Sequence, residues 1–145
     1  ATKLQYYAEY KLMSNTFLMG IVRKTKHFQK ILAEFSKSPR AISANSLVTR
    51  FATSMNKSTI YRILYKLEDD KIIHSFVGLN GLKWYAKCSD CSFKNHNDNH
   101  PHFQCEECDE VRCIKNVTNQ PELIGSQFHV KNVLLSGLCN RCFSD

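Results

Sequence analysis

Residues 56–70 read N-K-S-T-I-Y-R-I-L-Y-K-L-E-D-D and have the pattern of an amphipathic helix. Asn56 is a typical N-cap residue, and apolar side chains then recur every three or four positions, at Ile60, Ile63, Leu64 and Leu67. The opposite face presents hydroxyl groups and long cationic side chains, at Ser58, Thr59, Tyr61, Arg62, Tyr65 and Lys66. We therefore predict a helix over Lys57–Asp70 that buries one face and exposes the other.

The segment that follows this helix has the pattern of a β-hairpin. Ile72–Val77 is apolar and rich in residues that favour strands. The Asn80-Gly81 pair within Gly78–Gly81 is a strong signal for a tight hairpin turn. Lys83–Ala86 is then expected to be the returning strand.

Two further helices are predicted before this segment. Thr25 can cap a helix that runs through Phe35 and ends before Pro39, because apolar residues recur at helical spacing at Phe28, Ile31, Leu32 and Phe35. Ser43 can cap a shorter helix over Ala44–Phe51 that points Leu47, Val48 and Phe51 inward. Residues 1–20 are compatible with another amphipathic helix whose ends the sequence does not define.

Three helices followed by a hairpin are the plan of a winged helix-turn-helix domain. In that plan the last helix enters the major groove of DNA and the hairpin contacts the backbone. The polar face of the Lys57–Asp70 helix suits this role. The alternative at this point is an ordinary solvated helix face.

The distribution of charge within the 145 residues favours two functional regions. The net charge is +7, but residues 1–87 carry 15 Lys and Arg against 5 Asp and Glu, whereas residues 88–145 carry 5 against 8. The basic part has the sign needed to bind a polyanion such as DNA, although a solvated basic surface would also account for it. No apolar run approaches the roughly 18 residues of a membrane span, and no signal peptide is apparent, so we expect a cytoplasmic protein with no membrane partner.

The seven cysteines all lie in the second part, and six of them form three C-x-x-C pairs. Without a secretion signal, metal-bound thiolates are favoured over disulfides. Two such pairs, separated in the chain, can supply the four sulfur ligands of a structural zinc site, and these are Cys105, Cys108, Cys139 and Cys142. Strands over Glu110–Ile114 and Val130–Leu135, with a short helix around Glu122–Ser126, would complete a small α/β unit.

A second group of possible metal ligands lies just before the first of these pairs. It comprises Cys88, Cys91, His96, His100 and His102. His100 and His102 are two positions apart, so on an extended strand their rings point the same way. Thiolate and imidazole ligands suit zinc better than iron or manganese. The alternatives are a polar loop that contains histidines, a pairing of Cys88 with Cys91, or a further small zinc knuckle formed by Cys88, Cys91, His96 and one more histidine.

Together these features resemble the ferric uptake regulator (Fur) superfamily of metalloregulators. The resemblance runs from about Thr25 to Cys142 and rests on four motifs: S-T-I-Y-R at 58–62, H-P-H at 100–102, C-E-E-C at 105–108 and G-L-C-N-R-C at 137–142. It implies an α+β homodimer with a winged-helix DNA-binding domain over residues 1–87, a hinge with metal ligands over 88–102 and an α/β dimerisation domain over 103–145. It also implies that Thr59, Tyr61 and Arg62, with Ser58 beside them, contact a double-stranded DNA operator.

Within the superfamily, the departures from its pattern indicate the regulatory metal. Iron and peroxide sensors commonly have a histidine and two carboxylates where this chain has Ala41, Ala86 and Cys113. The motif Y-A-K-C-S at 85–89 instead resembles zinc uptake regulators. The resemblance therefore implies a regulatory zinc site made of His74, Cys88, His100 and His102, in which Cys91, His96 or Cys113 can replace a ligand.

The hypothesis from the sequence is a zinc-dependent repressor of metal uptake genes, with two zinc sites per chain. One alternative is an iron or peroxide sensor of the same superfamily, and a less favoured one is a zinc-ribbon RNA-binding protein. We do not expect an enzyme, because no acid or base partner for catalysis accompanies the histidine and cysteine cluster.

Overall fold

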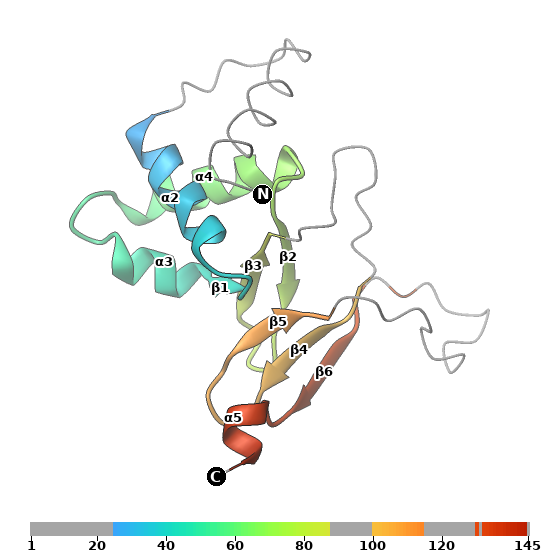
Figure 1. Cartoon of the computed structure of the whole chain (residues 1–145). Helices are drawn as coiled ribbons and strands as arrows, with labels where there is room; N and C mark the ends of the chain where they lie inside the picture. Colours follow the sequence, from blue (N-terminus) through green and yellow to red (C-terminus); the bar gives the residue numbers. More distant parts are fainter. Residues whose placement is uncertain (1–24, 88–99, 115–129, 131, 145) are drawn as a thin grey trace.

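The computed structural model describes residues 25–87, 100–114, 130 and 132–144. In Figure 1 a group of helices and a first sheet occupy one end of the molecule, and a second sheet with a short terminal helix occupies the other. None of the helices in the described ranges is both long and apolar enough to cross a membrane. The predicted segments over residues 1–20 and Glu122–Ser126 lie outside the described residues.

Three capped helices build the first part. The helices are α2 (Lys26–Lys37), α3 (Ala44–Arg50) and α4 (Lys57–Asp69). Their N-caps are the residues that the sequence predicts, because the side chains of Thr25, Ser43 and Asn56 accept hydrogen bonds from Phe28 N, Ser46 N and Thr59 N. The predicted apolar stripes meet in one core, which contains Phe28, Ile31, Leu32, Phe35, Leu47, Ile60, Ile63, Leu64, Leu67, Ile73 and Tyr85.

The hairpin follows α4, as the sequence predicts. Strand β2 (His74–Val77) pairs antiparallel with β3 (Lys83–Ala86), and His74 lies opposite Ala86. Gly81 adopts a φ of 70°, which glycine tolerates and which the tight turn requires. A two-residue strand, β1 (Ile42–Ser43), adds to the other edge of β3 and gives the order β1-β3-β2.

The second sheet has the order β5-β4-β6. Strand β4 (His102–Cys105) pairs antiparallel with β5 (Val111–Cys113) and parallel with β6 (Leu134–Gly137), and α5 (Asn140–Phe143) follows. The predicted strand Val130–Leu135 is thus displaced toward the C-terminus, because its pairing with β4 runs from Leu134 to Gly137. Sequence pattern alone does not contain this pairing.

The two parts are in direct contact. Ala41, Phe76 and Ala86 from the first part pack with Val111 from the second in a small buried cluster, against which Trp84 and Cys113 are packed. The backbone N–H of Ala41 donates to the carbonyl of Val111 at 2.9 Å. This contact brings β2 next to the second sheet, as Figure 1 shows.

Candidate metal centres

Four cysteines converge at the end of the second sheet. Cys105 is the last residue of β4, Cys108 lies in the turn after it, and Cys139 and Cys142 lie at the start of α5 and within it. The parallel pairing of β4 with β6 places Cys105 opposite Gly137, so the two C-x-x-C pairs meet. All four sulfur atoms lie within 4.8 Å of one another. This is the arrangement of a four-thiolate zinc site.

Backbone dipoles favour thiolate formation at one of these cysteines. The N–H groups of Cys108 and Cys139 point at the sulfur of Cys105 and lower the pKa of its thiol to about 6. Hydrogen bonding to Cys139 raises the pKa of Cys142 to about 12. Because a metal ion binds thiolates, binding of a dication at this centre would release the thiol protons that remain.

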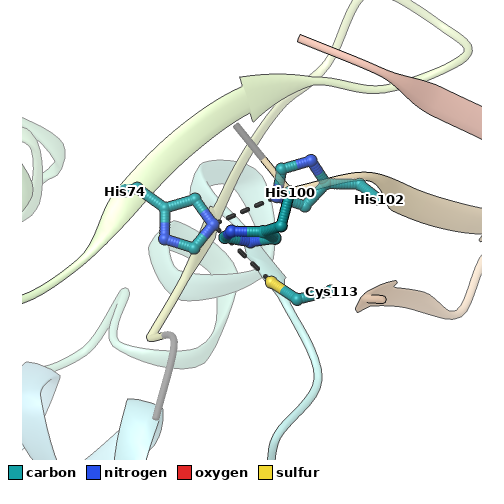
Figure 2. A group of neighbouring side chains, drawn as sticks. All are labelled: His74, His100, His102 and Cys113. Carbon is teal, nitrogen blue, oxygen red and sulfur yellow. Dashed lines mark hydrogen bonds between the residues drawn. The ribbon is translucent and has the colours of Figure 1, made fainter. Parts of the chain in front are cut away.

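A second cluster joins the two parts of the molecule. His74 begins β2, whereas His102 begins β4, His100 lies two residues before it and Cys113 ends β5. The Nε2 atoms of His74 and His102 are 3.1 Å apart, and the sulfur of Cys113 lies 3.6 Å from Nε2 of His74. One donor atom from each of the four residues lies within 4.8 Å of the other three. Figure 2 shows the four side chains pointing toward one another.

The surroundings of this cluster keep His102 neutral. His74 is 4% exposed and His102 is 2% exposed. Burial, together with repulsion from His100 and His74, lowers the pKa of His102 to about 3, so its imidazole is uncharged at neutral pH. The ring of Phe76 stacks on His102 with a centroid distance of 3.7 Å and holds its orientation. Among the described residues the cluster offers three imidazoles and one thiol and no carboxylate, a donor set that fits zinc better than iron or manganese.

The structure brings together three of the four predicted regulatory ligands, namely His74, His100 and His102. Cys88 lies outside the described residues, as do Cys91 and His96. Cys113, which the sequence identifies only as a possible substitute, lies in the cluster because β5 pairs with β4 and sets it opposite His102. The available sequence signal was its position on the strand that returns from the C-E-E-C turn.

The predicted DNA-contacting residues lie on one helix. Ser58, Tyr61 and Arg62 are exposed on α4, and Thr59 is half-buried near its start. The ammonium group of Lys57 lies 5.8 Å from the ring centroid of Tyr61. The opposite face of α4 is buried, so within the described part of the chain this is the exposed face of the helix.

Comparison with known proteins identifies the class. The model of the ferric uptake regulator family matches residues 20–136. The chain therefore belongs to the ferric uptake regulator family, whose members are DNA-binding metalloregulators of transcription and not enzymes. Membership confirms the resemblance seen in the sequence and the α+β fold predicted with it, and it disfavours the RNA-binding alternative.

Solved structures with the same fold include regulators of different metals. A zinc uptake regulator in complex with zinc and DNA is 22% identical, with 99% of this chain and 97% of that chain covered and a TM-score of 0.65. The Helicobacter pylori ferric uptake regulator is 16% identical, with 99% and 96% covered and a TM-score of 0.61. The Francisella tularensis ferric uptake regulator with iron is 19% identical, with 88% and 99% covered and a TM-score of 0.57. No curated protein matches the sequence of this chain.

Proposed function

We propose that this protein is a zinc-responsive transcriptional repressor that binds a double-stranded DNA operator as a homodimer and controls metal uptake genes. The observation that supports it most directly is the cluster of His74, His100, His102 and Cys113. Its donor atoms are nitrogen and sulfur, and one of them comes from the DNA-binding part. The similar folds of zinc and iron regulators do not distinguish the metals, so the proposal rests on this donor set.

The position of the cluster supports a role in regulation. His74 belongs to the hairpin that would form the wing, whereas His102 and Cys113 belong to the second sheet and His100 lies two residues before its strand β4. Such a site is complete only when the two parts are in contact. By thermodynamic linkage, a metal that binds there favours this arrangement, and an operator that requires the same arrangement raises metal affinity by the same factor.

The two metal centres are proposed to have different roles. We assign Cys105, Cys108, Cys139 and Cys142 to a structural zinc and the histidine cluster to a regulatory zinc. His74, His100 and His102 are common to the sequence and structural versions of the regulatory site. Cys113 is the fourth ligand that the described geometry supports, and Cys88 is the fourth ligand that the family resemblance supports.

The polar face of α4 is proposed as the operator-reading surface. Arg62 and Tyr61 are exposed there and can reach base edges in a major groove, and the basic first part supplies attraction to phosphates. The DNA-bound zinc uptake regulator of similar fold supports this assignment.

A metal titration tests the proposal. Protein that retains one structural zinc is titrated with zinc and, under anaerobic conditions, with ferrous iron, while binding to a cognate operator selected from random duplexes is followed by fluorescence anisotropy. We expect zinc to strengthen binding at free concentrations at which iron has no effect. Operator binding that responds to iron alone would instead favour the iron-sensor alternative, and binding that no metal changes would contradict the proposal.

A further inference from the structure

A second group of charged side chains lies at the junction of the two parts, away from the histidine cluster, and centres on Glu110. The side chain of Glu110 is only 5% exposed, and three arginines contact its carboxylate. Nε of Arg40 lies 3.2 Å from Oε1, Nη2 of Arg141 lies 2.6 Å from Oε2, and Nε of Arg112 donates to Oε1.

The three arginines come from different elements. Arg112 is on β5 and Arg141 is on α5, between Cys139 and Cys142, so both hold the carboxylate within the second part. Arg40 belongs to the segment between α2 and β1 in the DNA-binding part. Among the described ion pairs, Arg40 with Glu110 is the one that crosses between the two parts.

Backbone contacts next to Arg40 also join the two parts. The backbones of Arg40 and Arg112 form an isolated antiparallel β-bridge, and the N–H of Ala41 donates to the carbonyl of Val111 at 2.9 Å. At the hairpin, the N–H of Leu79 donates to Oε1 of the buried Gln104 at 2.8 Å. The contact between the parts therefore has a polar framework that does not include the histidine cluster.

We propose that Glu110 is a positioning residue, which through Arg40 holds the DNA-binding part in the arrangement that brings His74 to His100, His102 and Cys113. The arrangement in which the two parts are in contact would then be favoured before zinc binds. Because a larger fraction of the protein would be competent to bind, the apparent affinity for zinc would be higher. This inference rests on the proposed function, because it gives the ion pair a role in regulation through the histidine cluster.

The solvent exposure of Arg40 limits how strongly its ion pair with Glu110 can affect zinc binding. The Arg40 side chain is 46% exposed, so its pairing with the carboxylate is partly screened by solvent. We therefore expect its loss to weaken zinc binding at the histidine cluster about three- to fivefold.

Arg112 provides a matched control. Its side chain contacts the same carboxylate oxygen as Arg40 and is 53% exposed, but it lies two residues from Glu110, so this ion pair stays within the second part. Arg40→Ala and Arg112→Ala therefore each remove one cation from Glu110, and only Arg40→Ala removes the link. Arg40→Lys retains the charge and should restore much of the effect.

The experiment measures two quantities on the full chain with zinc retained in the cysteine centre and without DNA. The first is zinc affinity at the histidine cluster, by competition with a chromophoric chelator. The second is amide hydrogen exchange at Ala41, whose N–H crosses between the parts. We expect Arg40→Ala to lower the zinc affinity three- to fivefold and to speed amide exchange at Ala41. Arg112→Ala should change each of these quantities less than twofold. A direct contact of Arg40 with DNA would change neither.

Contrary outcomes are distinct. If wild-type protein binds a second zinc but Arg40→Ala leaves either quantity unchanged, or if Arg112→Ala has an equal effect, the positioning role of Glu110 is wrong and the proposed function stands. If wild-type protein binds no second zinc, the proposed function is wrong. In that case exchange at Ala41 alone tests the positioning role of Glu110. Faster exchange in Arg40→Ala only supports that role, and any other result contradicts it.

Discussion

At the scale of single residues, Cys113 changes the composition expected of the regulatory site. Its sulfur lies 3.6 Å from Nε2 of His74, across the boundary between the two parts. Cys88 directly follows the last described residue of the first part, Lys87, and remains a proposed ligand on the basis of the sequence. Substitution of each thiol separately identifies the one that completes the proposed regulatory site.

We predict that Cys113→Ser weakens regulatory zinc binding at least about tenfold, because a hydroxyl is a poor replacement for a thiolate on zinc. The measurement is zinc titration of operator binding, with Cys88→Ser and Cys91→Ser compared in parallel. Cys91→Ser should have a small effect, and all three variants should retain one zinc in the cysteine centre. A loss confined to Cys91→Ser would move the site into residues 88–99.

Glu34 illustrates how a buried charge stabilises the helical part. Its carboxylate is 5% exposed on α2 and is paired with Lys37 and with Arg50 of α3. Burial opposes its ionisation, but the hydrogen bonds from these two cations outweigh burial and hold the pKa of Glu34 below its usual value. A lowered folded-state pKa means that the carboxylate stabilises the fold above the unfolded pKa of about 4.3 and that this stability is lost as pH falls through the folded pKa.

We therefore predict that Glu34→Gln lowers the free energy of unfolding at pH 7 by about 1 to 2 kcal/mol, as expected for loss of charge-assisted hydrogen bonds. The difference from wild type should shrink as pH falls from 5 to 3. Urea denaturation at matched pH measures it, and because both proteins contain the same cysteine centre, acid release of metal affects them alike. A difference that grows as pH falls would contradict the assignment.

At the scale of elements, one face of α4 packs into the core and the opposite face is available for recognition. Ile60, Leu64 and Leu67 are completely buried, whereas Tyr61 is 38% exposed on the other side. Substitutions on the exposed face should therefore alter a partner contact without disturbing the core.

We predict that Arg62→Ala and Tyr61→Ala each weaken operator binding by about 1 to 3 kcal/mol, the usual cost of losing a base-edge contact. Zinc content and melting temperature should remain those of wild type. Arg62→Lys serves as the control, because it retains charge but loses the bidentate geometry of guanidinium. If Arg62→Lys binds as tightly as wild type, Arg62 contacts phosphate and not a base.

The hairpin and the second sheet interlock at Gly78. A Cβ atom at this position would lie 2.6 Å from Oε1 of Gln104 and 2.6 Å from Nε1 of Trp84. Glycine therefore allows the hairpin to approach β4 closely enough for the bond between Leu79 N and Gln104 Oε1. This close approach places β2, and His74 with it, against the second sheet.

At the scale of the whole molecule, the cysteine centre has little apolar packing to assist it. Helix α5 has no buried residues, and no side chain caps its start. Leu135 and Leu138 nearby are both almost half exposed. Metal ligation is thus the interaction best able to fix the end of the described chain to β4, which agrees with the folding free energy that structural zinc sites supply.

We predict that replacing Cys105, Cys108, Cys139 and Cys142 together with serine abolishes cooperative unfolding of the second part and shifts the protein from dimer to monomer. Differential scanning calorimetry and sedimentation velocity measure the two effects. Cys113→Ser is the control that leaves this centre intact. A quadruple variant that remains a dimer with unchanged melting would show that the centre has no structural role.

The local elements could be predicted from sequence because their signals lie within a few residues. Thr25, Ser43 and Asn56 each cap the helix that follows them, and Asn80-Gly81 forms the hairpin turn, because capping and turn formation involve neighbours in the chain. The paired C-x-x-C motifs predicted the four-cysteine group for a similar reason, since each pair is local and only their meeting is not.

The remainder was decided by tertiary pairing. The two-residue strand β1 exists because β3 offers it an edge, and β6 begins at Leu134 because β4 sets its register. Cys113 reaches His74 through the antiparallel turn from β4 to β5 and the packing of β2 against the second sheet, over 39 positions of sequence. Glu110 likewise meets Arg40 and Arg141 only in the folded chain. Residue types and spacing determined which ligands were available, and long-range strand pairing decided which of them meet.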